Sequence, residues 1–214
     1  HAWLALWHLL SDLQFVGPGE AGGTGSKSAA RDLAAAASHR APSDPFVRVV
    51  HGLVQSLTGG DAAAAAQGVS AALAVHPNDS LGWLAHAVLS GRRGDPDVGL
   101  QALAAARARS PLDPLGWLFD AVEADLLLRR HRWHDAIQLA RRSIRSNSRQ
   151  ALARRVLTIA QVEAHQIDAA RASLRELLCL RPCMTLRSDE AEHRTDPDHP
   201  RHGRALREAG LPAG

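Results

Sequence analysis

Apolar and small residues recur along this chain at the spacing of amphipathic α-helices. The pattern is clearest in residues 80–111, where Trp83 begins a first apolar run and a second run ends at Pro111. Between the runs, Asp95 is a suitable N-cap and Pro96 falls at the first helical position, where the missing N–H of a proline costs nothing. This segment therefore predicts a helical hairpin.

The hairpin pattern recurs along most of the chain. A small residue at the predicted helix crossing returns after 35, 34, 37 and 34 residues, and a proline or serine follows each one. A period of about 34 residues is typical of a helix–turn–helix array. The small residues are Ala30, Ala65, Gly99, Ala136 and Ala170, and the residues that follow them are Pro42, Pro77, Pro111, Ser148 and Pro182. The predicted hairpins pair Trp3–Phe15 with Ser28–His39 and then occupy residues 46–77, 80–111, 114–148 and 151–182.

Trp83, Ala87, Gly94, Ala106 and Pro111 resemble the W, G/A, G, A and P positions of tetratricopeptide repeats. Three further stretches resemble the C-terminal repeat region of bacterial class III adenylate/guanylate cyclases and related winged-helix transcriptional regulators. The resemblance implies an all-α, right-handed superhelical solenoid of about five tetratricopeptide-like hairpins with a C-terminal capping helix. The three stretches are Ser110–Leu118, Leu177–Leu186 and Leu206–Pro212.

The tail of the chain is expected to cap this array. Repeats pack only on their neighbours, so residues 1–182 are expected to form one array and residues 183–214 a tail that covers its apolar end. Asp196 is the predicted N-cap, Pro197 the first helical residue, and Gly210 the left-handed residue that ends the helix. The predicted inward stripe consists of His202, Leu206 and Ala209.

Composition adds expectations about compartment and context. The 214 residues are 45% hydrophobic and 22% charged, with a formal net charge of +3. No apolar run approaches the roughly 20 residues that cross a bilayer, so no membrane insertion is expected. The two cysteines are too few for a disulfide framework and favour a reducing cytoplasm. His1 opens directly into an apolar helical pattern without a signal peptide, which suggests a segment of a longer chain.

One glycine-rich segment invites a nucleotide-binding interpretation. Gly22–Ser28 resembles a phosphate-binding loop, but Ser26 replaces the required second glycine, and the preceding pattern is helical. An ordinary loop before a serine-capped helix is the preferred interpretation. Asp120 and Glu123 are interpreted as a solvated helix face rather than a general acid–base pair. We therefore expect no catalytic activity and no cofactor in this chain.

Twelve histidines raise the question of a metal site. His131 and His134 are three residues apart, as are His199 and His202, and His193 precedes the second pair. A zinc site needs three or four ligands with supporting partners, so solvated side chains are preferred for both pairs. Metal binding by the histidine-rich tail remains an open alternative.

The densest charge lies between Arg129 and Arg155, where nine arginines accompany one acid, Asp135. Such a patch attracts an acidic protein surface or phosphate groups. We expect an acidic protein partner or plain solvation, and nucleic-acid contact is the less favoured alternative. The residues assigned to this basic patch are Arg141, Arg142, Arg145, Arg154 and Arg155.

The first helix of each hairpin is expected to line a concave groove. Its side chains either pack the array or form an apolar groove that receives a helix from a protein partner or from a missing N-terminal part of the protein. The groove-facing residues are Val47, Val50, Val54, Leu57, Leu81, Leu84 and Val88.

The sequence thus predicts a protein-interaction and regulatory module that is not catalytic by itself. The resemblance implies a larger bacterial signalling protein whose output is either cyclic-nucleotide synthesis or transcription control. Two alternatives stay open: a nucleotide-binding or enzymatic segment at Gly22–Ser28, and nucleic-acid contact through Arg129–Arg155.

Overall fold

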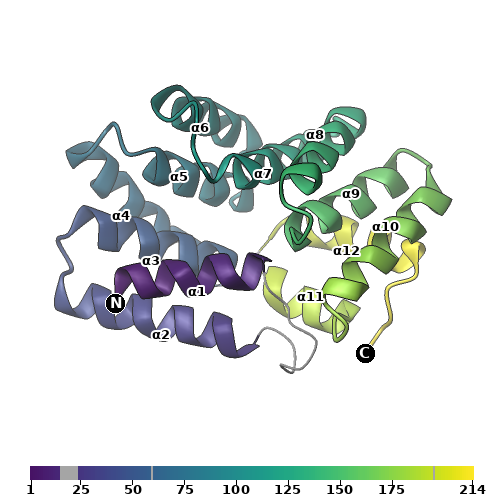
Figure 1. Cartoon of the computed structure of the whole chain (residues 1–214), viewed down its shortest axis with the longest axis horizontal. Coiled ribbons are helices and arrows are strands. Elements are labelled where there is room, and N and C mark those ends of the chain that lie inside the picture. Colours follow the sequence, from purple (N-terminus) through teal and green to yellow (C-terminus); the bar gives the residue numbers. More distant parts are fainter. Residues whose placement is uncertain (15–23, 59, 195) are drawn as a thin grey trace. The chain divides into compact units, whose positions relative to one another are not determined.

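The computed structural model describes residues 1–14, 24–58, 60–194 and 196–214, and regular structure in these ranges is entirely α-helical (Figure 1). This confirms the predicted all-α fold class. The twelve helices of the described ranges are α1 Ala2–Gln14, α2 Thr24–Arg40, α3 Pro45–Leu57, α4 Ala62–Val75, α5 Ser80–Arg92, α6 Pro96–Arg109, α7 Gly116–Arg129, α8 Trp133–Ser146, α9 Ala151–Glu163, α10 Ile167–Leu180, α11 Leu186–His193 and α12 His199–Ala209.

The chain divides into two compact units. The N-terminal unit comprises residues 1–12 and 24–113, and the C-terminal unit contains residues 114–214. The tail 183–214, which the sequence pattern sets apart from the repeats, lies within the C-terminal unit together with α7–α10.

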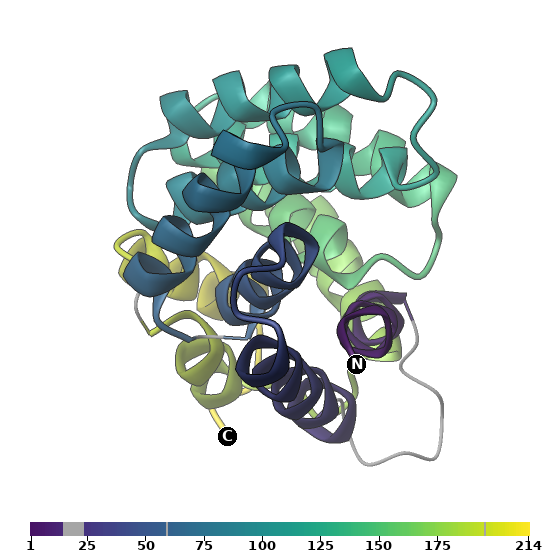
Figure 2. The ribbon, with the colours of Figure 1, turned by 90° about the vertical axis from the view of Figure 1, so that its left-hand side faces the viewer.

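Consecutive helices pack as hairpins in both units. Contacts join α3 with α4, α5 with α6, α7 with α8, and α9 with α10. The helices α1 and α2 lie side by side in both ribbon views (Figures 1 and 2) and share one hydrophobic cluster. The first helices of successive hairpins also touch, α3 against α5 and α7 against α9. The described chain is therefore a tetratricopeptide-like array of helical hairpins.

Aspartates start several of these helices in the way that the sequence predicts. Asp95 accepts a hydrogen bond from the backbone N–H of Val98 at 3.2 Å, and Pro96 occupies the first turn of α6. Asp44, Asp61 and Asp79 cap α3, α4 and α5 in the same manner. Each of these carboxylates satisfies N–H groups that a helix start leaves without a partner.

The recurring small residues lie where helices cross. All five are buried, and the exposed fractions of Ala30, Ala136 and Ala170 are 0%. Gly52 on α3 has the same role, because a Cβ atom there would lie 2.4 Å from Cγ2 of Val69 on α4. A larger side chain at these points would push the two helices apart.

The turn inside each of the last three hairpins needs one residue with positive φ. Gly94 adopts φ 83° in the third hairpin, where glycine pays no steric cost. His131 (φ 58°) and His165 (φ 59°) occupy the matching positions of the fourth and fifth hairpins. His131 is therefore a turn residue of the backbone, which accounts for its place without a metal.

Two predicted helix starts are wrong. The second helix begins at Thr24 instead of Ser28, so it takes up part of the predicted glycine-rich loop. The last helix begins at His199, after Asp198, instead of at Pro197, and Pro200 is the proline of its first turn. The reason is that the Asp196 carboxylate is bound by Arg129 and accepts the Asp198 N–H at 3.0 Å.

The predicted cap is otherwise confirmed, with one helix more than expected. The additional helix is α11, which packs on α12, and α12 in turn contacts α9 and α10 of the fifth hairpin. Gly210 adopts φ 104°, and the Leu211 N–H donates to the carbonyl of Leu206 at 2.9 Å, as a Schellman ending requires. The inward stripe of His202, Leu206 and Ala209 is buried.

Candidate protein-interaction surfaces

The predicted groove residues divide into buried and half-buried sets. Val47, Val50, Val54 and Leu84 are buried, with at most 7% of their surface exposed. The half-buried set consists of Leu57, Leu81 and Val88. The sequence allows these residues either to pack the array or to line an apolar groove. The buried set packs the array.

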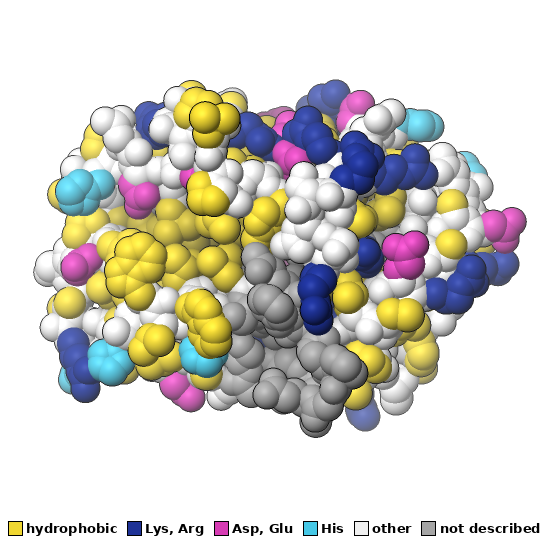
Figure 3. Space-filling view, viewed as in Figure 1, with side chains coloured by type: hydrophobic (Ala, Val, Ile, Leu, Met, Phe, Trp, Pro, Cys, Tyr) yellow, Lys and Arg dark blue, Asp and Glu magenta, His cyan; other side chains and the backbone are white. Residues whose placement is uncertain are grey.

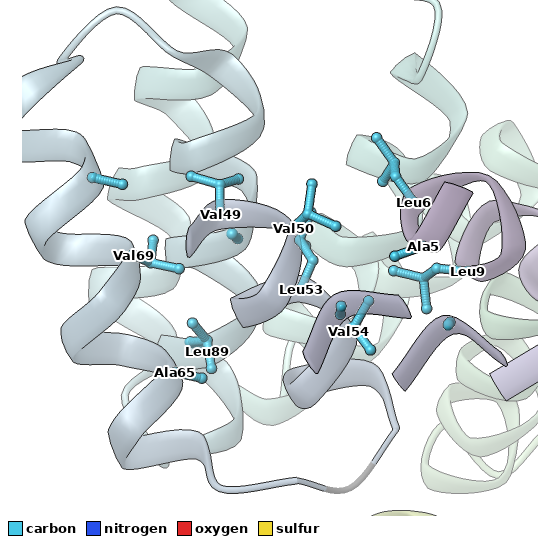
Figure 4. Packing of buried hydrophobic residues seen from close by; sticks show 14 of the residues in the cluster. Ala5, Leu6, Leu9, Val49, Val50, Leu53, Val54, Ala65, Val69 and Leu89 are labelled. Atoms are coloured by element: carbon cyan, nitrogen blue, oxygen red, sulfur yellow. The ribbon is translucent and has the colours of Figure 1, made fainter. Parts of the chain in front are cut away.

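The helix α1 covers the apolar stripe of α3. Ala5, Leu6 and Leu9 belong to the same hydrophobic cluster as Val50 and Val54. Figure 4 shows these α1 side chains directed toward α3. One face of α1 is therefore an internal part of the N-terminal unit.

The opposite face of α1 is equally apolar but exposed. Trp3, Leu4 and Trp7 are 72%, 53% and 61% exposed. We call these three residues the outer face of α1. The ring of Trp3 lies 4.6 Å from the half-buried ring of Phe46 on α3, measured between centroids. In Figure 3, hydrophobic side chains gather on this face of the N-terminal unit, over α1, α3 and α5.

Sequence reasoning missed this surface although the signal was present. In an α-helix of 3.6 residues per turn, Ala5, Leu6 and Leu9 face one side, so Trp3 and Trp7 must face the other. A helix that is apolar on all sides is normally buried on all sides. The outer face of α1 is therefore the strongest candidate interaction site among the described residues.

The predicted basic patch is divided between the surface and the interior of the fold. Arg141 and Arg145 on α8 are exposed as expected, but Arg154 and Arg155 on α9 are buried. Arg142 donates to both carboxylate oxygens of Asp120 at 2.7 and 2.6 Å, and this carboxylate raises the pKa of Arg142. The assignment of Arg154 and Arg155 to a surface patch is therefore wrong, since both face the protein interior.

Arg129 is the centre of a buried ion-pair cluster between α7 and the tail. It donates to both oxygens of Asp196 at 2.7 Å, to Asp125 at 2.8 Å and to Asp198 at 3.2 Å. The side chains of Arg129 and Asp196 are 3% and 0% exposed. Burial acts to lower the pKa of Arg129, but Asp125 and Asp196 outweigh it and raise that pKa. The arginine therefore stays charged and joins α7 to the start of α12.

A second buried pair joins α9 to α11. Arg155 donates to the two carboxylate oxygens of Asp189 at 2.6 and 2.9 Å. Burial alone would raise the pKa of Asp189, but the charge and hydrogen bonds of Arg155 lower it well below its usual range. His193 and His199 also approach this carboxylate, at 3.5 and 3.4 Å. Two histidines of the predicted metal candidates thus line an internal ion pair.

His202 on α12 is another buried ionisable side chain of the C-terminal unit. Its exposed fraction is 0%, and burial together with the nearby charge of Arg155 lowers its pKa from 6.5 to about 3. The imidazole is therefore neutral in the folded protein at pH 7 but protonates in the unfolded chain as the pH falls through 6.5.

Acid is therefore expected to destabilise the cap through His202. Because the unfolded chain binds the extra proton between pH 6.5 and about 3, stability contributed by His202 is complete above 6.5 and is lost on acidification. The loss between pH 7 and pH 5 should be about 2 kcal/mol. Urea unfolding at both pH values, followed by circular dichroism, measures it. His202→Leu should remove most of this difference, and His134→Leu at an exposed position of α8 should retain it. Equal losses in His202→Leu and in the unaltered protein would contradict the assignment.

The remaining sequence candidates do not converge. Thr24–Ser28 forms the first turns of α2, and the preceding glycines lie outside the described residues. Cys179 and Cys183 are free and exposed. Within the described ranges, no group of three or more His, Cys, Asp or Glu side chains could hold a metal ion. Nor is any helix of those ranges long and apolar enough to span a bilayer.

Comparisons with known proteins add little to this picture. No model of a known protein family matches the chain, and no curated protein matches it. Among solved structures, the chain is similar to one in "Structure of Naa15/Naa10 bound to HypK-THB", at 14% sequence identity and a TM-score of 0.45. That match covers 97% of this chain and 30% of the other. The helical hairpins of the chain itself define its class as a tetratricopeptide-like helical repeat.

Proposed function

We propose that this chain is a protein-interaction module, without catalysis of its own, that binds an apolar helix on the outer face of α1. The single observation that carries the proposal is the exposure of Trp3, Leu4 and Trp7 side by side on one helix. Exposed apolar patches of this kind mark interaction sites, and tryptophan is enriched among the residues that dominate binding energy.

The array itself supports a helix as the bound element. The first helices α3 and α5 are each flanked on both sides by other helices of the unit, and most of their residues are buried. The helix α1 is just as apolar, and it packs on the cluster through Ala5, Leu6, Leu9 and the half-buried Leu10. Its Trp3, Leu4 and Trp7 stay more than half exposed. A helix packed on the outer face would give α1 the surroundings that α3 and α5 already have.

We further propose that this module is the regulatory part of a larger bacterial signalling protein in the cytoplasm. The support is the resemblance of Ser110–Leu118, Leu177–Leu186 and Leu206–Pro212 to the repeat region of class III cyclases and winged-helix regulators. A cyclase catalytic domain or a winged helix encoded in the same polypeptide would bear out this proposal, and an unrelated output domain would overturn it.

Binding of an apolar helix can be tested with a synthetic peptide. The probe is an uncharged helical peptide with leucines at i, i+3, i+4 and i+7 and glutamines elsewhere. Trp3 and Trp7 should leave water on binding, so the tryptophan emission should shift to shorter wavelength and saturate. Leu4→Glu should abolish the shift while keeping both indoles, because it places a charge at the centre of the contact.

The matched control is Leu112→Glu, which changes a leucine that is 96% exposed elsewhere in the N-terminal unit. This control should bind the peptide like the unaltered protein. For the monomeric protein, no change of emission at about 1 mM peptide, or equal binding by Leu4→Glu, would contradict the proposal.

A further inference from the structure

We infer that the outer face of α1 binds the outer face of α1 from a second copy of this chain, so that the protein is a symmetric dimer. This inference rests on the proposed function, because it names the partner of the same surface. Three features of the outer face support it: the spacing of its side chains, the absence of charged residues in this part of α1, and the area that it exposes.

The spacing on α1 is that of a helix-pairing seam. Trp3 and Trp7 lie at i and i+4 on the outer face, with Leu4 beside them, whereas the half-buried Leu10 at i+7 packs against the internal cluster. The i, i+4 spacing is one at which two helices exchange side chains along a common line. In an antiparallel pair related by a two-fold axis, Trp3 of one copy lies opposite Trp7 of the other, which brings indole against indole.

The charge pattern permits the same surface to meet itself. Residues 1–10 contain no aspartate, glutamate, lysine or arginine. A symmetric contact brings this face against the same face of the second copy, so charges of a single sign on it would meet like charges. An antiparallel pair also sets the positive end of one helix dipole beside the negative end of the other.

The outer face of α1 supplies about two thirds of the area of the smallest specific interfaces. From their exposed fractions, Trp3, Leu4 and Trp7 would remove roughly 400 Å² from water in each copy. Two copies then lose about 800 Å² through these residues alone, and the smallest specific interfaces bury about 1,200 Å². Side chains that flank the outer face, such as the half-buried Phe46 against Trp3, supply part of the remainder.

The test is the mass of the protein in solution, measured by size-exclusion chromatography with light scattering from about 1 to 100 µM. We expect a dimer whose mass falls twofold in Leu4→Glu/Trp7→Glu. Both side chains are more than half exposed, so circular dichroism should show the same helix content in this variant. Leu112→Glu, at another exposed leucine, should remain dimeric.

Two outcomes would overturn the inference: a monomer at every concentration, or a Leu4→Glu/Trp7→Glu variant that is still dimeric. A monomer that binds the leucine–glutamine peptide, and loses that binding in Leu4→Glu, would overturn the dimer while supporting the proposed function. A monomer that does not bind the peptide would overturn both.

Discussion

Replacing Arg129 with methionine is expected to lower the free energy of unfolding of the C-terminal unit by about 3–5 kcal/mol. The change leaves Asp125, Asp196 and Asp198 without the guanidinium that all three contact. The Asp196 side chain is 0% exposed, so water cannot replace the lost partner. Urea unfolding at pH 7 measures the loss, and hydrogen exchange should show that α11 and α12 open first.

Arg132 provides a matched control for the replacement of Arg129. Arg132, also in the arginine-rich segment, pairs with Asp135 at 2.6 Å, but the two side chains are 60% and 50% exposed. Arg132→Met should therefore cost less than about 1 kcal/mol. In a double-mutant cycle, Asp196→Leu should recover part of the Arg129→Met loss, because the buried carboxylate is then gone. Equal losses in Arg129→Met and Arg132→Met would contradict a buried ion-pair cluster.

The second large effect is expected for Leu206→Asp in the capping helix. Leu206 is 0% exposed on α12, which packs on α9 and α10. Losing its burial costs about 1.5–3 kcal/mol, and an unpaired carboxylate in that place adds a further penalty. The melting temperature should fall visibly in a thermal scan followed by circular dichroism.

Arg204→Asp introduces the same side chain at an exposed position of α12 and should leave the melting temperature nearly unchanged. Deletion of residues 197–214 should destabilise the protein at least as much as Leu206→Asp, because it uncovers the fifth hairpin. An unchanged melting temperature after either Leu206→Asp or the deletion would contradict the capping role.

Short-range sequence patterns predict some features of the C-terminal cap and not others. The stripe of His202, Leu206 and Ala209 and the glycine at position 210 could be predicted, because both depend on residues within a few turns of one another. The helix start could not, because Asp196 serves Arg129 instead of capping α12. The local pattern assigned Asp196 to the N-cap of the helix, but its carboxylate instead binds Arg129, which is distant in the sequence.

Part of the basic patch was mispredicted for the same reason, because Arg154 and Arg155 are buried. Nine arginines in one stretch are visible in the sequence, but the buried ones have acidic partners far along the chain. Asp189 lies 34 residues from Arg155, and Asp196 lies 67 residues from Arg129. Only the folded chain brings these charges together, and so Arg129 and Arg155 link the repeats to the tail from inside the fold.

The sequence by itself determined the helical hairpins, their repeat, the N-cap at Asp95 and the capped C-terminal end, because periodicity, N-caps and turns act within a few residues. The tertiary structure alone decided which apolar and charged side chains remain at the surface. It buried Val50 and Val54 under α1 and left Trp3 and Trp7 in water. Burial depends on which helices lie side by side, and that is a property of the packed array, not of any one segment.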